Sequence, residues 1–299
     1  MMLNIAIVGF GNVGRAAYEA VLAAQDMTVR CVVESPQLTA PEHMKDIWLT
    51  DIAQIHTYGK VDCALLCLPT RICPQVAQTL LAMGVNTVDG YDIHDSIWDV
   101  RCELDEIAKQ HGARAILAAG WDPGSDSVVR ALMQAIVPRG ITYTNFGPGM
   151  SMGHSVAAKA IPGVANALSI TLPTGAGVHR RMVYVELETG ATLEQVTREL
   201  KADAYFANDD THVTQVDDIA ALQDVGHGVQ MTRKGSSGAT HNQLLEFSMR
   251  INNPALTGQV MAACARATAK QAPGAYTMIE VPVADLLSGT LEQHVRSLV

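Results

Sequence analysis

Ile5-Ala6-Ile7-Val8-Gly9-Phe10-Gly11-Asn12-Val13-Gly14 decides the fold, because an apolar strand here runs directly into the pattern G-x-G-x-x-G. Glycines at this spacing allow a tight turn, a close approach of the backbone to a pyrophosphate, and close packing of the next helix on the strand. The alanine-rich segment 15–24 favours that helix, whose first N–H groups would face the phosphates. We therefore predict a dinucleotide site whose phosphate-binding residues are Gly9, Gly11, Asn12, Val13 and Gly14.

The residue expected at the adenosine ribose ends the second strand, about twenty residues after the last glycine. Residues 29–34 supply that strand, and Glu34 ends it. A carboxylate there accepts both ribose hydroxyls of NAD, whereas it repels the 2′-phosphate of NADP unless Ser35, Gln37 or a lysine compensates. The local sequence thus favours NAD, and a solvent-facing Glu34 in a loop is the alternative.

Composition excludes several classes of protein. The 299 residues are 48% hydrophobic and 17% charged, which suffices for two domains and a large core. The formal net charge of −9 argues against nucleic acid or an anionic membrane surface as partner. The sequence has no apolar run of the ~20 residues that a membrane helix needs, and it enters the first strand without a signal-peptide pattern. We expect a cytoplasmic enzyme.

The six cysteines stand in apolar strand or helix contexts, without C-x-x-C pairs or histidines at ligand spacing. Buried thiols are therefore expected, rather than disulfides, a zinc site or a nucleophile. No metal site is predicted.

Up to about residue 120, short apolar runs alternate with helical patterns. Buried parallel strands are expected over 61–68, 85–88 and 113–119, with helices over 74–83 and 100–111. This alternation is typical of an α/β fold with a Rossmann-type, doubly wound parallel sheet.

After Pro138 the pattern changes to alternating strands with few helices. Strands are expected over 141–144, 168–171, 182–187 and 244–251, and a helix over 193–202. We predict a second, α+β domain for substrate binding and oligomerisation over 121–253, built on an open mixed sheet. Helical spacing from Pro254 onward indicates a long helix that returns to the first domain. The dinucleotide-binding domain is then 1–120 completed by 254–299, and the protein is expected to be a homo-oligomer, a dimer or a hexamer.

Polar residues gather where strands of the first domain end, at the edge where ligands bind in such sheets. Leu68, Pro69 and Thr70 end one strand, Asp89 and Asp92 follow the next, and Trp121-Asp122 lies between glycines after a third. Turn capping is the alternative role for the two aspartates, and a tight turn with a core tryptophan is the alternative for Trp121-Asp122. The Gly-rich segment 145–155 is expected to be a flexible functional loop near the domain junction.

Taken in order, the motifs GFGNVGR, DGYDIH, GWDPG, FGPGMSMGHS, AIPGV, HN and NNP resemble the meso-diaminopimelate dehydrogenase family over nearly the whole chain. GWDPG and GPGxSxGHS are far more specific than the glycine pattern. The resemblance implies reversible oxidative deamination of the D-centre of meso-2,6-diaminopimelate to L-2-amino-6-oxopimelate and ammonia, usually with NADP. That reaction serves the lysine and peptidoglycan precursor pathway. Activity on simple D-amino acids would follow if the residues around the L-centre bind it with low selectivity.

The same resemblance implies two sets of substrate-binding residues. Around the D-centre it places Asp92, Trp121, Asp122, Met152 and Gly153, and around the L-centre Phe146, Thr171, Arg181, His227 and Asn253. A guanidinium with a hydroxyl suits a carboxylate, and aspartates suit the reacting ammonium. One of the two aspartates is expected either to accept the proton that the ammonium loses or to activate water on the iminium, and His154 is a further candidate for a proton relay. A structural role is the alternative for His154, and His179 is interpreted as solvent-facing.

One departure concerns the cofactor. Many members of the family carry paired arginines after the second strand, where this sequence has Ser35 and Pro36, so NADP and NAD both stay open. Another Rossmann amino acid dehydrogenase, resembling aspartate dehydrogenase, or a dipicolinate-type reductase is the alternative enzyme. A dinucleotide-sensing regulator without catalysis is the alternative outside enzymes.

Overall fold

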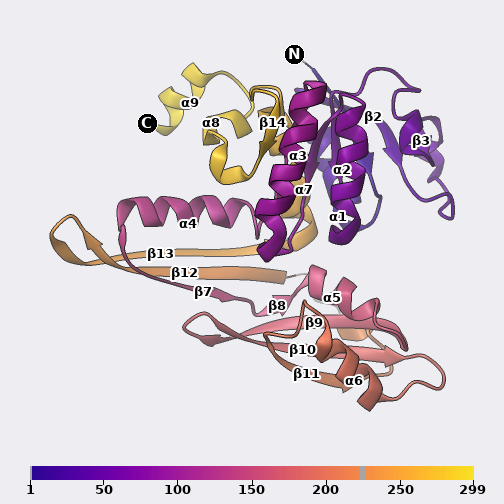
Figure 1. The fold of residues 1–299 in the computed structure, drawn as a ribbon, viewed down its shortest axis with the longest axis vertical. Coiled ribbons are helices and arrows are strands. Elements are labelled where there is room, and N and C mark those ends of the chain that lie inside the picture. The colour runs from indigo at the N-terminus through magenta and orange to yellow at the C-terminus, as the bar shows by residue number, and fades with distance from the viewer. Residues whose placement is uncertain (1, 223–225) are drawn as a thin grey trace. The chain divides into compact units, whose positions relative to one another are not determined.

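The computed structural model describes residues 2–222 and 226–299, which divide into two compact units. Unit 1 comprises the residues up to 129 together with 254–299, and unit 2 comprises 130–253. Both units are drawn in Figure 1. Each unit has its own sheets and its own apolar core.

Unit 1 is built on a seven-stranded parallel sheet in the order β14-β6-β5-β4-β1-β2-β3. Its strands are β1 (Leu3–Val8), β2 (Met27–Val33), β3 (Trp48–Leu49), β4 (Cys63–Leu66), β5 (Asn86–Asp89), β6 (Arg114–Ile116) and β14 (Gly274–Tyr276). The order runs outward from β1 in both directions, which defines a doubly wound sheet and a switch point at the carboxyl end of β1. The predicted Rossmann-type α/β fold is confirmed.

Helices cover both faces of this sheet: α1 (Asn12–Ala23), α2 (Cys73–Ala82), α3 (Ile97–His111) and α7 (Asn253–Thr268), with the shorter α8 (Val283–Leu286) and α9 (Leu291–Leu298) after them. Alternate side chains of a strand point to opposite faces. Ile5 and Ile7 therefore share one core with Met261 of α7, while Val8 packs with Leu80 of α2 on the other face. Short 3₁₀-helices link the elements of unit 1 at η1 (Glu42–Ile47), η2 (Ile52–Gln54), η3 (Thr70–Ile72), η4 (His94–Ser96) and η6 (Met278–Glu280), and η5 (Ala220–Leu222) lies in unit 2.

Unit 2 contains a four-stranded mixed sheet in the order β11-β10-β9-β8. Its strands are β8 (Gly149–Met150), β9 (Val164–Gly175), β10 (Val178–Leu187) and β11 (Asp210–Gln215), and only the β10–β11 pair is parallel. Helix α6 (Leu193–Ala202) makes that parallel crossover, and α5 (Met152–Lys159) packs on β9. Thr192 caps α6 by accepting the N–H of Gln195, and Val196 and Leu200 bury its apolar face.

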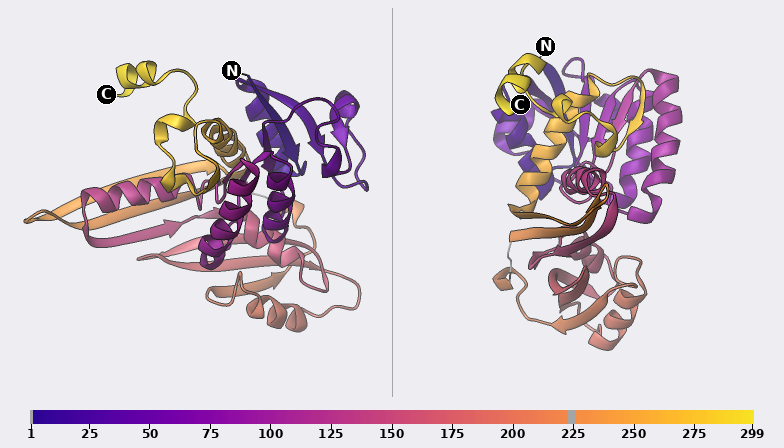
Figure 2. Two further views of the ribbon diagram at one scale, coloured as in Figure 1. Left: turned by 45° about the horizontal axis from the view of Figure 1, so that its top comes forward. Right: turned by 90° about the vertical axis from the view of Figure 1, so that its left-hand side faces the viewer.

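A second sheet of unit 2 is antiparallel, with the order β13-β12-β7. It consists of β7 (Arg139–Phe146), β12 (Gly226–Ser237) and β13 (Thr240–Asn252), and α4 (Ser125–Ile136) lies along it, seen end-on in the right-hand view of Figure 2. Buried Arg233 donates to the carbonyl of Val137 and to Oγ1 of Thr142, which ties the end of α4 to the sheet. The predicted mixed sheet is present, but the sequence pattern did not separate this antiparallel sheet from it.

All six cysteines are free thiols. Burial raises the pKa of Cys31 to about 11 and the pKa of Cys63 and of Cys67 to about 12, so these thiols stay protonated at neutral pH. Within the described ranges, no helix is long and apolar enough to span a membrane.

Candidate active site

The glycine loop after β1 has the shape that a dinucleotide requires. Gly9 has φ +89°, and a Cβ there would lie 2.4 Å from the carbonyl oxygen of Cys67. A Cβ on Gly14 would lie 2.0 Å from the carbonyl oxygen of Gly9, so α1 packs directly on the loop. A Cβ on Gly11 would meet no atom within 4 Å, which leaves open space where a phosphate approaches the backbone. The N–H groups of the next three residues have no acceptor within α1 and suit an anion.

Glu34, directly after β2, turns toward this loop. Its Oε2 accepts the N–H of Phe10 at 2.5 Å, and its Oε1 accepts the N–H of Ser35 at 2.6 Å. The carboxylate is therefore fixed beside the glycine loop, and each of its oxygens keeps a lone pair for a further donor. The alternative of a solvent-facing Glu34 does not fit these contacts.

The loops after β4 and β5 are joined by one hydrogen bond. Oγ1 of Thr70 accepts the N–H of Asp92 at 3.0 Å, which holds Asp92 at the carboxyl edge of the sheet, half-buried. Asp89, 1% exposed, instead accepts the N–H of Tyr91 at 2.9 Å, as a turn-capping residue does. Burial raises the pKa of Asp89 to about 6. Asp92 is thus the member of this acidic pair with access to a ligand.

The GWDPG segment forms a tight turn. The N–H of Gly120 donates to the carbonyl of Pro123 at 3.0 Å, and a Cβ on Gly124 would lie 1.9 Å from the carbonyl oxygen of Gly120. Trp121 is 6% exposed, so its side chain is largely buried. Asp122, next to it, is half-buried and thus the more accessible residue of the pair.

In unit 2, Arg181 lies between two acceptors. The register of β10 pairs it with Thr171 on β9 and with Thr211 on β11. Its Nη1 donates to Oγ1 of Thr171, and its Nε donates to Oδ2 of Asp209 at 2.6 Å. The Arg181 side chain is 13% exposed and that of Asp209 is 25% exposed. The result is a desolvated guanidinium in a fixed orientation, which suits a carboxylate.

His154 connects Asp209 to the start of α5. Its Nδ1 lies 2.9 Å from Oγ of Ser151, the N-cap of α5, and its Nε2 lies 3.6 Å from Oδ2 of Asp209. Edge-to-face contacts with Tyr205 and Phe206 hold the ring. Burial alone raises the pKa of Asp209, but hydrogen bonds from His154 and Arg181 outweigh it and lower the pKa to about 2. These contacts agree with the structural alternative for His154.

The prediction of a flexible loop over 145–155 is wrong over most of its length, because β7 ends at Phe146, β8 occupies Gly149–Met150 and α5 begins at Met152. Gly147 and Gly149 have φ of +91° and +152°, and a Cβ on Gly149 would lie 2.0 Å from the carbonyl oxygen of Gly226. A Cβ on Gly147 would instead lie 2.3 Å from the carbonyl oxygen of Thr171, so these glycines permit close approach to β9 and β12 rather than flexibility. Met152 and Gly153 begin α5.

Two further histidines stand near Arg181. Burial first, and then the charge of Arg181, lowers the pKa of His227 to about 4, so its imidazole is neutral at pH 7. Nε2 of His179 accepts the N–H of Phe146 at 2.6 Å, and burial lowers the pKa of His179 as well. The interpretation of His179 as solvent-facing is wrong, because it is half-buried and fixes Phe146. Asn253, 7% exposed, begins α7.

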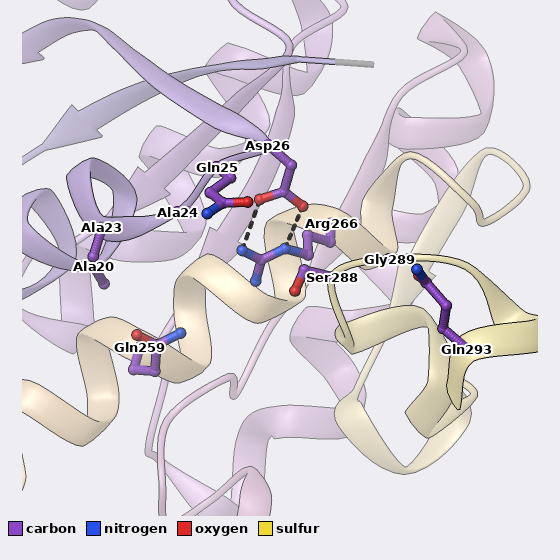
Figure 3. Close-up of a pocket in the computed structure, with 10 residues that line it drawn as sticks. All are labelled: Ala20, Ala23, Ala24, Gln25, Asp26, Gln259, Arg266, Ser288, Gly289 and Gln293. Atoms are coloured by element: carbon purple, nitrogen blue, oxygen red, sulfur yellow. Dashed lines mark hydrogen bonds and ion pairs between the residues drawn. The ribbon is translucent and has the colours of Figure 1, made fainter. Parts of the chain in front are cut away.

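A cavity of about 650 Å³ in unit 1, shown in Figure 3, lies away from these residues. It is next to the end of α1 and the start of β2, at the amino edge of the sheet, and the Asp26–Arg266 ion pair lines it. Ligands of doubly wound sheets bind at the opposite edge. The glycine loop, rather than this cavity, marks the cofactor position.

A doubly wound sheet, a glycine loop and acids at the carboxyl edge define a dinucleotide-dependent dehydrogenase. Residues 120–180 match the family described as diaminopimelic acid dehydrogenase C-terminal domain. The chain is 57% identical to the meso-diaminopimelate D-dehydrogenase of Bacteroides fragilis over 99% of both chains, and 32% identical to that of Ureibacillus thermosphaericus over 94% of both. The chain belongs to the meso-diaminopimelate D-dehydrogenase family, as the motifs predicted.

Solved structures of related dehydrogenases agree with this family assignment. The chain resembles an engineered D-amino acid dehydrogenase bound to NADP⁺, with a TM-score of 0.89 and 26% identity over 100% of both chains. It also resembles the diaminopimelate dehydrogenase of Corynebacterium glutamicum in complex with diaminopimelate, with a TM-score of 0.88 and 27% identity over 99% of both chains. A nicotinamide dinucleotide as cofactor follows from the family and from the fit of the glycine loop.

Proposed function

We propose that this protein oxidises the D-centre of meso-2,6-diaminopimelate, giving L-2-amino-6-oxopimelate and ammonia. The observation that carries this proposal is the Arg181 clamp, held by Thr171 and Asp209, in a chain 57% identical over its length to a meso-diaminopimelate D-dehydrogenase. When bound, the nicotinamide accepts the hydride from the Cα of the D-centre. The resulting imine takes up water and releases ammonia, and the reaction is reversible.

Unit 1 supplies the reacting end. The glycine loop and the first N–H groups of α1 bind the pyrophosphate. Asp92 and Asp122, both half-buried beyond β5 and β6, bind the reacting ammonium, and one of them takes the proton that it must lose before hydride leaves. The neighbouring Trp121 is 6% exposed, and its apolar ring limits water at this end. Leu68, Pro69 and Thr70 follow β4 and contact the cofactor.

Unit 2 supplies the recognition of carboxylates and of the second ammonium. Arg181 and Thr171 bind the carboxylate of the L-centre, because the guanidinium fork is fixed and poorly solvated. Neutral His227 and the amide of Asn253 accept from the L-centre ammonium without repelling it. Phe146 packs on the carbon chain. The backbone N–H groups of Met152 and Gly153 at the start of α5 face the carboxylate of the D-centre.

A stereochemical comparison tests this function. The L,L isomer of diaminopimelate has no D-centre to present for hydride transfer, so its kcat/KM should be at least about 100-fold below that of the meso isomer. Initial rates of NADPH or NADH formation measure both. Equal rates on the two isomers contradict the proposal, and cofactor binding without turnover of any amino acid supports a regulator instead.

Glu34 supports NAD as a cofactor. Its carboxylate accepts the N–H groups of Phe10 and Ser35 beside the glycine loop, and Ser35 and Pro36 provide no guanidinium for a 2′-phosphate. A dianionic phosphate within about 4–6 Å of a carboxylate costs several kcal/mol at an effective dielectric near 20 unless a cation intervenes. Lys45 already pairs with Glu42 at 2.5 Å. NAD is therefore a competent cofactor of this protein.

A double variant tests the role of Glu34. Glu34→Ala with Ser35→Arg removes the repulsion and adds a fork for phosphate, so the ratio of kcat/KM for NADP to that for NAD should rise at least about 10-fold. Ser35→Arg alone is the matched control, because it keeps the carboxylate. A strong preference of the unmodified protein for NADP overturns the assignment of Glu34 as a ribose ligand.

Exposed apolar side chains of unit 2 support the proposal that the protein self-associates. Large apolar side chains are exposed on α4 (Leu132 60%, Ile136 50%) and on the antiparallel sheet (Ile141 60%, Leu244 56%). Such apolar surface marks contact with another protein, here a second copy of the chain. Analytical ultracentrifugation gives the number of copies.

A further inference from the structure

Five side chains of unit 2 form one continuous polar chain of contacts. Ser151, the N-cap of α5, contacts His154, which faces Asp209, which binds Arg181, which donates to Thr171. The chain thus runs from the start of α5 to the carboxylate clamp. Asp209 is its centre, because its Oδ2 faces both His154 and Arg181.

Asp209 does two things for Arg181. It neutralises a guanidinium that is 13% exposed, and an unpaired charge at that burial is costly. It also fixes the Nε edge of the fork while Thr171 fixes Nη1. Among the described residues these are the hydrogen bonds of the Arg181 side chain, and they leave Nη2 for a ligand. An arginine fixed in this way loses less side-chain entropy when a carboxylate binds.

The neighbouring aspartate shows that this placement is specific. Successive side chains of a strand point to opposite faces. Asp210 therefore binds Arg180 at 2.7 Å and His212 at 2.9 Å on the other face, and all three of these side chains are about half exposed, at 47–51%. Two adjacent aspartates thus pair with two adjacent arginines, one pair half-buried at the clamp and one in solvent.

We propose that Asp209 is the positioning residue of the carboxylate clamp and that, through Arg181, it determines the selectivity for a substrate with two amino acid centres. This inference rests on the function proposed above. Asp209 need not touch the substrate. Its contact with His154 also fixes the clamp relative to the start of α5, so the spacing of the two carboxylates of one substrate is set within unit 2.

The experiment compares Asp209→Asn with the matched control Asp210→Asn, using two ligands. One is meso-diaminopimelate, and the other is D-2-aminoheptanoate, which keeps the D-centre and the carbon chain but lacks the second ammonium and carboxylate. The second ligand is measured as a substrate or, if it is not turned over, as a competitive inhibitor. Circular dichroism and the melting temperature establish that each variant is folded.

In Asp209→Asn the KM for meso-diaminopimelate should rise at least about 10-fold, while kcat changes less than about 3-fold. The KM for D-2-aminoheptanoate, or its inhibition constant if it is not turned over, should stay within about 2-fold of the value for the unmodified protein. Asp210→Asn should leave all three values within about 2-fold of the unmodified protein. A loss for meso-diaminopimelate alone identifies Asp209 as a residue that positions Arg181, because a general loosening of unit 2 would weaken the binding of both ligands.

Equal losses for both ligands, or an unchanged KM for meso-diaminopimelate, overturn the inference. If Asp209→Asn does not fold, Asp209→Glu keeps the charge and displaces it by one methylene. The same comparison then tests the inference: the KM for meso-diaminopimelate should rise while the constant for D-2-aminoheptanoate does not. An unmodified protein that does not oxidise meso-diaminopimelate refutes the proposed function itself, which is a separate outcome.

Discussion

Asp92 and Asp122 are the residues on which proton transfer depends. Replacing either by Asn keeps its shape but removes a proton acceptor and half of an ion pair with the reacting ammonium. For the aspartate that acts as base, kcat for oxidation should fall about 100-fold or more. The variant of the other aspartate should show mainly a rise in KM. Steady-state kinetics with meso-diaminopimelate separate the two roles. Nearly full kcat in both variants would assign the proton to water or to His154.

Residues with local constraints were predictable from the sequence, whereas residues with distant partners were predictable only where the family resemblance named them, as for Thr171 and Arg181. Gly9 and Gly14 are recognisable because their close contacts arise within the loop itself and at the strand beside it. Asp209 gave no signal, because its partner Arg181 is 28 positions away across a parallel crossover. His179 likewise depends on the β7 residue Phe146, 33 positions away. One sequence contains the side chains but not the strand register that joins them.

At the scale of elements, the packing of α1 on β1 gives a contrast between two glycines. Gly14→Ala puts a methyl group 2.0 Å from the backbone oxygen of Gly9, so α1 must move away from the loop. Both the melting temperature and the affinity for the dinucleotide should fall. Gly11→Ala, whose methyl group meets no atom within 4 Å, should keep the melting temperature and weaken dinucleotide binding alone. Thermal denaturation and cofactor titration check the pair, and equal melting temperatures in both variants contradict the assigned packing.

Helices with strong local signals were predicted well. The expected helix over 193–202 coincides with α6, whose Thr192 cap and apolar spacing are both visible in the sequence. Helix α5 was missed because Gly153, His154 and Ser155 have low helix propensity, and it is stabilised instead by packing on β9 and by the Ser151–His154 contact. The antiparallel sheet was missed because alternation shows that one face of a strand is buried, but not which strand lies beside it.

At the scale of the whole molecule, stability should depend on pH through Asp89. Burial raises its pKa to about 6 from the ordinary 3.8, so between pH 4 and 6 the native state holds a proton that the unfolded chain has released. Stability falls as pH rises through this window, by up to about 3 kcal/mol at 1.36 kcal/mol per pKa unit. Asp89→Asn removes this loss, so its free energy of unfolding relative to the unmodified protein should increase from pH 4 to pH 7.

Other titrating groups do not obscure the difference in unfolding free energy between Asp89→Asn and the unmodified protein. The lowered pKa of His227, about 4, makes stability rise with pH between pH 4 and 6.5, but His227 is present in both proteins and its contribution cancels. Asp209, with a pKa of about 2, titrates below the window. Denaturant unfolding at several pH values gives the comparison. A difference between the two proteins that does not vary with pH would show that Asp89 ionises normally.

Unit 1 is assembled from both ends of the sequence, since β14 lies beside β6 and α7 packs on α1, while unit 2 is an uninterrupted insert. During synthesis on a ribosome, the insert over 130–253 is therefore complete before the cofactor-binding unit has its last strand. Until then the edge of β6 and the face of β1 that Met261 covers remain exposed. We expect nascent chains stopped before residue 254 to need chaperones, with unit 2 folded first.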